Sequence, residues 1–195
     1  MQRKKITIGT EYGAAHNLGL VLQGEKPTLA TQFYMAYDEK GLRVRIQAEI
    51  GKPLRSAFEG EFMPVWRGDV VEIFLSPEGK EDWYYEFDFA PNGSYFHAHI
   101  YNPDNKTAYN HCLDPDHGIK GHITIEKGIW TTEMFIPYAE MNLQGKTLSE
   151  IKALPWRFNV FRYDDGNEEF CSFAPTGADY INFHIASAFA DLVLE

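Results

Sequence analysis

Trp66 and Glu72 are the first two side chains in the sequence whose types and spacing could bind a ligand together. Glu72 stands in the run Val70–Leu75, whose other residues are all apolar, and such a run predicts a central strand. A carboxylate inside that strand needs a partner. The partner is either an internal salt bridge or backbone contact, or the hydroxyl groups of a ligand. Sugars suit the second alternative, because their C–H faces stack on an indole while carboxylates accept hydrogen bonds from their hydroxyls.

The run Trp83–Phe89 adds two more carboxylates. Its odd positions are all aromatic, whereas Glu86 and Asp88 share the even positions with Tyr84. The alternation predicts that the odd positions face the core and that the acidic positions face either solvent or the same ligand as Glu72. Paired carboxylates also serve glycoside hydrolysis, but that reaction needs a controlled separation that the spacing does not define. We therefore expect binding rather than hydrolysis.

Two further groups could hold a metal ion. His97 and His99 share one face of a predicted strand, as metal-binding histidines do, but no glutamate follows them to complete the set, and satisfied histidines are the alternative. Asp164, Asp165 and Asn167 offer oxygen ligands for calcium without the spacing of an EF-hand, and they equally suit a polar turn. No nucleophile or phosphate-binding motif is present, which favours binding over catalysis.

The composition excludes several partners. Of the 195 residues, 28 are acidic and 18 basic, so the net charge is −10. With no basic cluster beyond Arg3–Lys5, we expect neither a nucleic-acid partner nor an anionic membrane. No apolar run could span a membrane, and no signal-peptide core follows the basic start. A trimmed leader would indicate a secreted or periplasmic protein, and a complete chain a cytoplasmic one. Cys112 and Cys171 permit one disulfide without requiring it.

Alternation of polar and apolar residues dominates the chain, so we expect β-strands to position these side chains. The run 43–50 alternates polar and apolar side chains, which predicts a strand with one buried face. The other predicted strands are 32–37, 70–75, 83–90, 95–101, 121–126, 129–136, 156–163, 168–174 and 190–194. Only 137–141 and 147–154 have a helical pattern, with Ser149 as a candidate cap for the second. The pattern predicts one all-β domain over residues 1–195, an antiparallel β-sandwich of jelly-roll or immunoglobulin-like type with one or two short helical turns.

Four blocks of sequence resemble the family-nine carbohydrate-binding modules, which are associated with xylanases, and the single-domain relatives of these modules. In chain order they are Trp66–Leu75; Trp83–Phe87 followed by Pro91–Gly93; Trp130–Pro137; and Trp156–Arg162 followed by Ser172–Pro175 and Asn182–His184. The resemblance runs from about residue 30 to the C-terminus. It implies a β-sandwich that binds a sugar without cleaving it, often with structural calcium.

The resemblance also implies roles for particular residues. In the family, two tryptophans clamp the sugar and a glutamate, an arginine and an amide bind it. Trp66 fits the first tryptophan and Glu72 the glutamate, whereas Phe173 stands in place of the second tryptophan and Asp88 near the place of the arginine. Tyr180, in a loop beside polar groups, is a further candidate for an aromatic side chain that lines the sugar site. We expect these five residues to bind a mono- or oligosaccharide, with no required cofactor.

Two alternatives remain at this stage. Similar folds elsewhere bind haem or another cofactor through methionine or histidine, and Met35, Met63, His97 and His99 are the available ligands. A metal-dependent enzyme that uses His97 and His99 is the second alternative.

Overall fold

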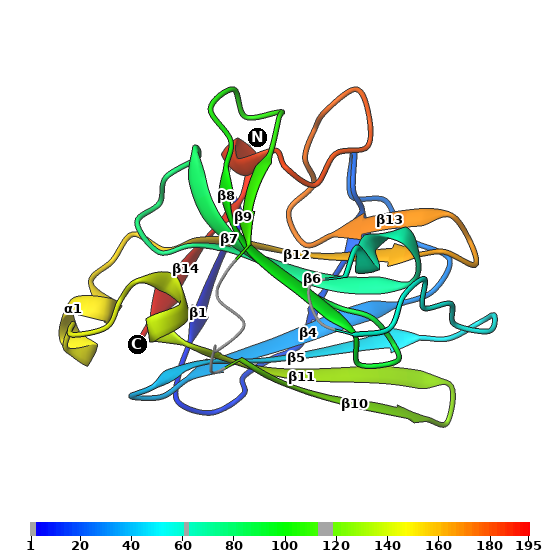
Figure 1. Ribbon diagram of the computed structural model, residues 1–195, viewed down its shortest axis with the longest axis horizontal. Helices are drawn as coiled ribbons and strands as arrows, with labels where there is room; N and C mark the ends of the chain where they lie inside the picture. Colours follow the sequence, from blue (N-terminus) through cyan, green and yellow to red (C-terminus); the bar gives the residue numbers. More distant parts are fainter. Residues whose placement is uncertain (1–2, 61–62, 113–118) are drawn as a thin grey trace.

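The computed structural model describes residues 3–60, 63–112 and 119–195, and it consists of two β-sheets packed face to face (Figure 1). The larger sheet contains, in spatial order, β1 (Lys5–Ile8), β14 (Ala190–Leu194), β12 (Arg157–Asp164), β6 (Val70–Ser76), β7 (Trp83–Phe89), β8 (Tyr95–Tyr101) and β9 (Tyr109–Cys112). Beside β12 it also holds β13 (Glu169–Ser172), which pairs with the short β3 (Gly19–Leu20). The second sheet contains β10 (Lys120–Glu126), β11 (Ile129–Pro137), β5 (Gly41–Glu49), β4 (Thr31–Tyr37) and β2 (His16–Asn17).

The predicted antiparallel β-sandwich is confirmed. Every strand pair in the described part of the chain is antiparallel except β1 with β14, which run parallel at one edge. All ten predicted strands are present, and their ends shift by two residues at most. The sequence pattern missed β1, β2, β3 and β9. β1 and β9 have four residues each, and β2 and β3 have two each, so these strands are too short to show a clear alternation.

The core between the sheets is built by the alternation that predicted the strands. Val44 and Ile46 of β5 meet Val71 and Ile73 of β6 in one buried apolar cluster. The opposite face of the larger sheet is also buried, because a second cluster lies on it. That cluster contains Val70, Phe74, Phe161, Phe189 and their neighbours. The strands β6, β7 and β12 are therefore covered on both faces, and Glu72 belongs to the outer one.

Helical structure is short. The expected turn at 137–141 is η2 (Tyr138–Met141), and the segment 147–154 contains α1 (Leu148–Lys152). The cap of α1 is Thr147 and not Ser149: the Thr147 hydroxyl accepts from the backbone N–H of Glu150, whose carboxylate accepts from the backbone N–H of Thr147. Two further single turns are η1 (Val65–Arg67) and η3 (Ala186–Ala188). In the described residues, no helix is long and apolar enough to cross a membrane.

Candidate functional site

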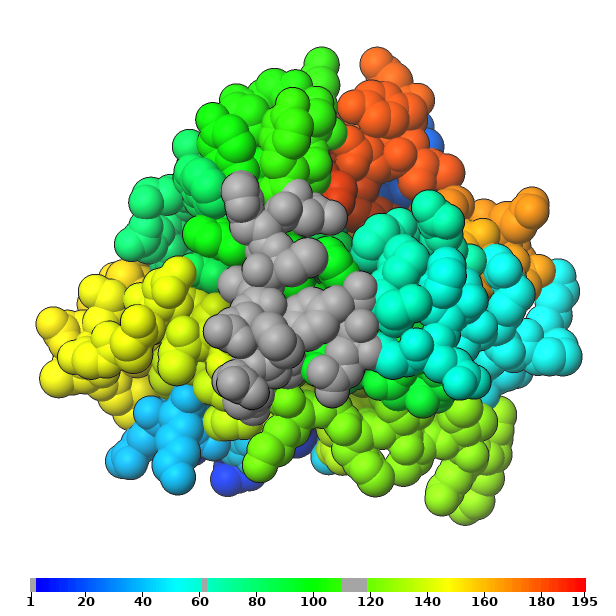
Figure 2. All heavy atoms as spheres, viewed as in Figure 1, coloured from blue at the N-terminus to red at the C-terminus, as the bar shows by residue number. Residues whose placement is uncertain are grey.

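A cavity of about 530 Å³ lies over the outer face of the larger sheet. The segments that enclose it come from distant parts of the sequence, near residues 66, 107 and 182, and Figure 2 shows these blue-green, green and orange-red segments around one face of the molecule. The lining residues are Trp66, Glu72, Glu86, Lys106, Thr107, Ala108, Tyr163, Phe170, Ile181, Asn182, Phe183 and His184. The cavity thus combines aromatic rings with two carboxylates.

The acidic part of the cavity comes from two neighbouring strands. Glu72 on β6 is paired with Asp88 on β7, and Glu86 lies two residues before Asp88 on the same face. One oxygen from each of these three carboxyl groups lies within 4.8 Å of the other two. All three residues are buried, with exposed fractions of 3% for Glu72, 5% for Glu86 and 0% for Asp88. Of the three, Glu72 and Glu86 line the cavity, whereas Asp88 is fully buried beside Glu72 and does not reach the cavity surface.

Burial makes these carboxyl groups weak acids. Desolvation raises the pKa of Glu86 to about 7. Desolvation also raises the pKa values of Glu72 and Asp88 well above their ordinary range, and the nearby carboxylates add repulsion. The cluster of Glu72, Glu86 and Asp88, named the acidic triad below, therefore retains protons at pH values where ordinary carboxyl groups have lost them. A bound cation or hydrogen-bond donor would stabilise its charged form.

His184 sits beside the triad in a defined hydrogen-bond network. Asn102 Nδ2 donates to the Tyr84 hydroxyl over 3.2 Å and to the His184 carbonyl over 2.8 Å. Tyr84 can then donate its own proton to His184 Nδ1, 2.8 Å away, which assigns the histidine proton to Nε2. Nε2 faces Glu86 Oε2 at 4.0 Å. Burial lowers the pKa of His184 to about 4, so its ring is neutral near pH 7.

Packed aromatic rings form the apolar part of the cavity. Trp66 is 40% exposed, and its ring meets Phe96 edge-on at 4.9 Å between centroids, which fixes the indole while part of it stays open. Phe183 stacks on Phe161 at 4.3 Å, and Phe170 stacks on Tyr163 at 4.4 Å. These contacts hold the rings in place before a ligand arrives, which lowers the entropy cost of binding.

The predicted site residues fall into two groups. Trp66 and Glu72 line the cavity together, and Asp88 supports it from below. Phe173 does not join them: it is 7% exposed and lies in the core between the sheets, stacked on Phe158 and edge-on to Phe33. Phe173 directly follows β13, and its backbone N–H donates to the Val160 carbonyl of β12; this register turns its ring inward. Tyr180 is 50% exposed and lies outside the cavity lining, although the next residue, Ile181, is part of it.

Several lining residues were not singled out from the sequence. Of the two alternatives for Glu86, solvent or the face of Glu72, the structure places it on the face of Glu72. Phe170, Phe183 and His184, and not Phe173, line the cavity together with Glu72 and Glu86. Phe183 and His184 belong to a block that resembles the family, but nothing local in the sequence signals that this loop folds back over β6 and β7.

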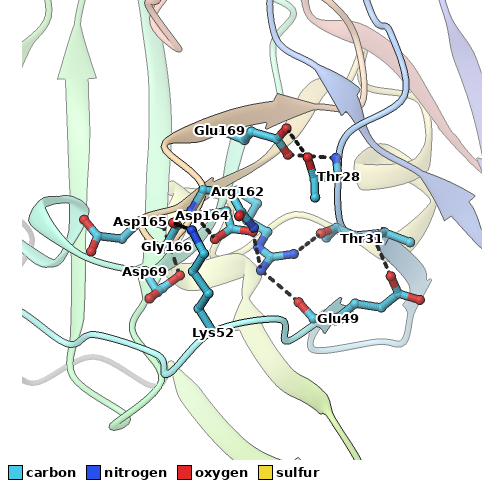
Figure 3. A network of polar contacts seen from close by, with 12 residues as sticks. Thr28, Thr31, Glu49, Lys52, Asp69, Arg162, Asp164, Asp165, Gly166 and Glu169 are labelled. Atoms are coloured by element: carbon cyan, nitrogen blue, oxygen red, sulfur yellow. Dashed lines mark hydrogen bonds and ion pairs between the residues drawn. The ribbon is translucent and has the colours of Figure 1, made fainter.

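The candidate calcium ligands Asp164 and Asp165 are each paired with an arginine, and Figure 3 shows Asp164 beside Arg162. Asp164 Oδ2 lies 3.2 Å from Arg162 Nη2, and both of its oxygens also accept hydrogen bonds from Asn167. Asp165 accepts from Arg55 Nε over 2.6 Å, and this contact lowers its pKa. A guanidinium therefore already supplies the positive charge that these carboxylates need.

The residues considered for haem are not brought together. Met35 is buried in the core between the sheets, whereas Met63 packs against the outer-face cluster. His97 and His99 stack on Phe87 and Tyr85, which belong to the core between the sheets. Of the described residues, only Glu72, Glu86 and Asp88 form a group of three that could bind one metal ion.

Cys171, one of the two cysteines that could have formed a disulfide, is a buried free thiol in β13. The side chain of Cys112 lies outside the part of the chain that the structure describes.

The sequence matches no protein-family profile and no curated protein, but the fold matches solved structures. A Bacteroides uniformis protein, provisionally assigned as carbohydrate-binding, superposes with a TM-score of 0.81 at 17% identity over the whole of both chains. A carbohydrate-binding module family 9 from Caldicellulosiruptor kristjanssonii was solved with glucose and with cellotriose. These structures superpose with TM-scores of 0.60 and 0.61 at 14% identity, over 98% of this chain and 96% and 94% of theirs. The chain therefore has the fold of the family-nine modules, as the sequence resemblance implied.

Proposed function

We propose that this chain binds a sugar, without cleaving it, in the cavity between Trp66 and the acidic triad. The observation that carries the proposal is the partly exposed Trp66 ring on the same cavity as the Glu72 and Glu86 carboxyl groups. A pyranose presents a flat C–H face and a rim of hydroxyls, and these two kinds of surface match an indole and a pair of carboxylates.

The size of the cavity and the fold support the same function. Ligand pockets commonly occupy about 300–1,000 Å³, and the cavity of about 530 Å³ falls in that range. The structures of the same fold that hold glucose and cellotriose support a sugar as the ligand.

The arrangement of the carboxyl groups favours binding over hydrolysis. Glycoside hydrolases place two carboxyl groups on opposite sides of the scissile bond. Here the three carboxyl groups gather within 4.8 Å on one side of the cavity, and Asp88 lies below its surface. This placement gives a ligand one acidic contact surface rather than an acid and a base that flank it.

The test is isothermal titration calorimetry with glucose, xylose, galactose and cellotriose, with reducing-end release from cellotriose followed in parallel. We expect at least one sugar to bind and no sugar to be cleaved. Trp66→Ala should weaken binding about 5- to 150-fold, the equivalent of losing roughly 1–3 kcal/mol of stacking. Tyr34→Ala is the control, because Tyr34 alternates with the core residues Phe33 and Met35 and so faces away from the larger sheet. Equal affinities for wild type and Trp66→Ala would contradict the proposal.

A further inference from the structure

The surroundings of the acidic triad supply little positive charge to stabilise its ionised form. Among the described residues, the one basic side chain within ion-pair distance of the triad is His184, whose Nε2 lies 4.0 Å from Glu86 Oε2, at the outer limit for such a contact. Lys106 also lines the cavity, but no described contact joins it to a triad carboxylate. A buried cluster of carboxyl groups in this state needs protons or a cation from outside the protein.

The buried oxygens of the triad are also short of donors. In the described part of the chain, no backbone or side-chain group donates a hydrogen bond to Asp88 Oδ1, Asp88 Oδ2 or Glu86 Oε2. Glu86 and Asp88 lie close enough to share a proton between their carboxyl groups. Asp88 is fully buried and belongs to the group whose oxygens converge. Buried polar atoms without partners are rare in folded proteins, and an ion is one established reason for them.

We propose that Glu72, Glu86 and Asp88 bind a calcium ion at the floor of the cavity. The part of this inference that concerns sugar rests on the proposed function: the ion keeps coordination positions on the cavity side, and sugar hydroxyls occupy them. Asp88 is the deep ligand, and Glu72 and Glu86 are the ligands at the cavity surface.

The geometry of the triad suits calcium. Two oxygens bound to one Ca²⁺ at about 2.3–2.6 Å can be at most about 5 Å apart, and the triad oxygens satisfy this limit at 4.8 Å or less. Mg²⁺ needs shorter bonds of about 2.0–2.1 Å and near-ideal octahedral geometry. Softer metals prefer nitrogen and sulfur, which the triad does not offer. Calcium takes about 6–8 oxygens, so three carboxylates leave positions for water or hydroxyl groups.

The same positions explain how an acidic cavity could hold a neutral sugar. Three adjacent carboxylates repel one another, and two of them would have to lose solvent when a sugar covers the cavity. A divalent ion compensates most of that charge and offers its open positions to two neighbouring hydroxyl oxygens. A sugar would then be held by the ion from below and by the Trp66 ring from the side.

The experiment is a calorimetric titration of CaCl₂ into protein freed of metal with EGTA and then dialysed. We expect one calcium per chain, and a calcium-dependent rise in the melting temperature. Asp88→Asn and Glu86→Gln should each weaken calcium binding at least tenfold. Both substitutions preserve side-chain size, and circular dichroism checks that each variant is folded.

Asp165→Asn is the matched control, because Asp165 is an aspartate already paired with Arg55, outside the triad. It should leave calcium affinity unchanged. No calcium binding by wild type would overturn the inference, and so would loss of binding in Asp165→Asn with full binding in both triad variants. If Asp88→Asn does not fold, Glu86→Gln and the melting temperature of wild type with and without calcium decide the question.

Sugar titrations in CaCl₂ and in EGTA separate this inference from the proposed function. Sugar binding that is lost in EGTA supports both. Equal sugar binding in EGTA, without calcium binding, overturns the calcium site and leaves the proposed function standing. Calcium binding without any sugar binding supports the calcium site and overturns the proposed function. Glucosamine, titrated in EGTA, covers the competing case: if it binds where glucose does not, and calcium does not bind, the triad holds an ammonium group and the calcium site is wrong.

Discussion

Glu72 and Asp88 lie directly opposite each other on β6 and β7, with no described positive group between them. Like charges at facing positions destabilise a sheet, and burial adds to the cost. Apart from Glu86 and Ser76, the other residues of β6 and β7 are aliphatic or aromatic. The pair therefore destabilises the fold locally, and residues that do so are often retained because they serve a functional site.

The acidic triad should make the protein more stable on the acid side of neutrality. Burial raises the pKa of Glu86 to about 7 from an ordinary 4.5, so the folded state holds this proton more tightly than the unfolded state does. The resulting stabilisation is fully present below about pH 4.5 and is lost as the pH rises through 7. His184, whose pKa is lowered to about 4 by burial, acts in the opposite sense: its contribution is present above pH 6.5 and is lost as the pH falls through 4.

Urea unfolding in EGTA at pH 5.0 to 7.5, with wild type and Glu86→Gln compared at each pH, measures this effect. The two proteins share the titration of His184, so the difference between their free energies of unfolding isolates Glu86. The free energy of unfolding of wild type should fall relative to that of Glu86→Gln across this range, because the folded state releases the Glu86 proton only as the pH passes about 7. A difference that stays constant or rises with pH would show that Glu86 is not protonated in the folded state.

Arg162 should be among the largest single contributors to stability. It is 1% exposed on β12, pairs with Asp164, and donates to the Thr31 hydroxyl and the Glu49 carbonyl of the second sheet over 2.9 Å each. Removing one partner of a buried ion pair costs about 3–5 kcal/mol, so Arg162→Met should lower the free energy of unfolding by that amount. The exposed pair Arg45–Glu133 supplies the control, since Arg45→Met should cost about 1 kcal/mol or less. Similar losses for the two variants would contradict the role of Arg162 as a link between the sheets.

The hydroxyl of Tyr84 should matter because it holds His184 in place. Tyr84→Phe removes an acceptor from Asn102 and a donor from His184, both in a buried network. We expect the variant to lose about 1–3 kcal/mol of stability in urea unfolding. Tyr109→Phe, at a tyrosine that is 54% exposed, should stay within about 0.5 kcal/mol of wild type. A Tyr84→Phe variant as stable as wild type would mean that the network contributes little.

The fold was largely predictable from sequence, because strand period and turn residues act locally. The alternation in Val70–Leu75 and Trp83–Phe89 correctly separated core positions from the face that carries Glu72, Glu86 and Asp88. The far wall of the cavity was not predictable in this way. Phe183 and His184 come from a C-terminal loop, and their position depends on how that loop folds over β6 and β7. Phe173 shows the same limit, since a shift of one residue along a strand exchanges the core face and the cavity face.

Sugar binding between Trp66 and the acidic triad is tested most directly by a sugar titration of ¹⁵N-tryptophan-labelled protein in CaCl₂. The titration is followed on the indole N–H resonances of the four tryptophans. Trp66→Phe assigns the resonance of Trp66. Trp130 and Trp156 are buried in the core, and Trp83 lies in a different hollow beside Tyr85 and His99. We predict that glucose or cellotriose shifts the Trp66 resonance most and leaves those of Trp130 and Trp156 in place. A saturating sugar that shifts Trp83 alone, or no indole at all, would contradict sugar binding between Trp66 and the acidic triad.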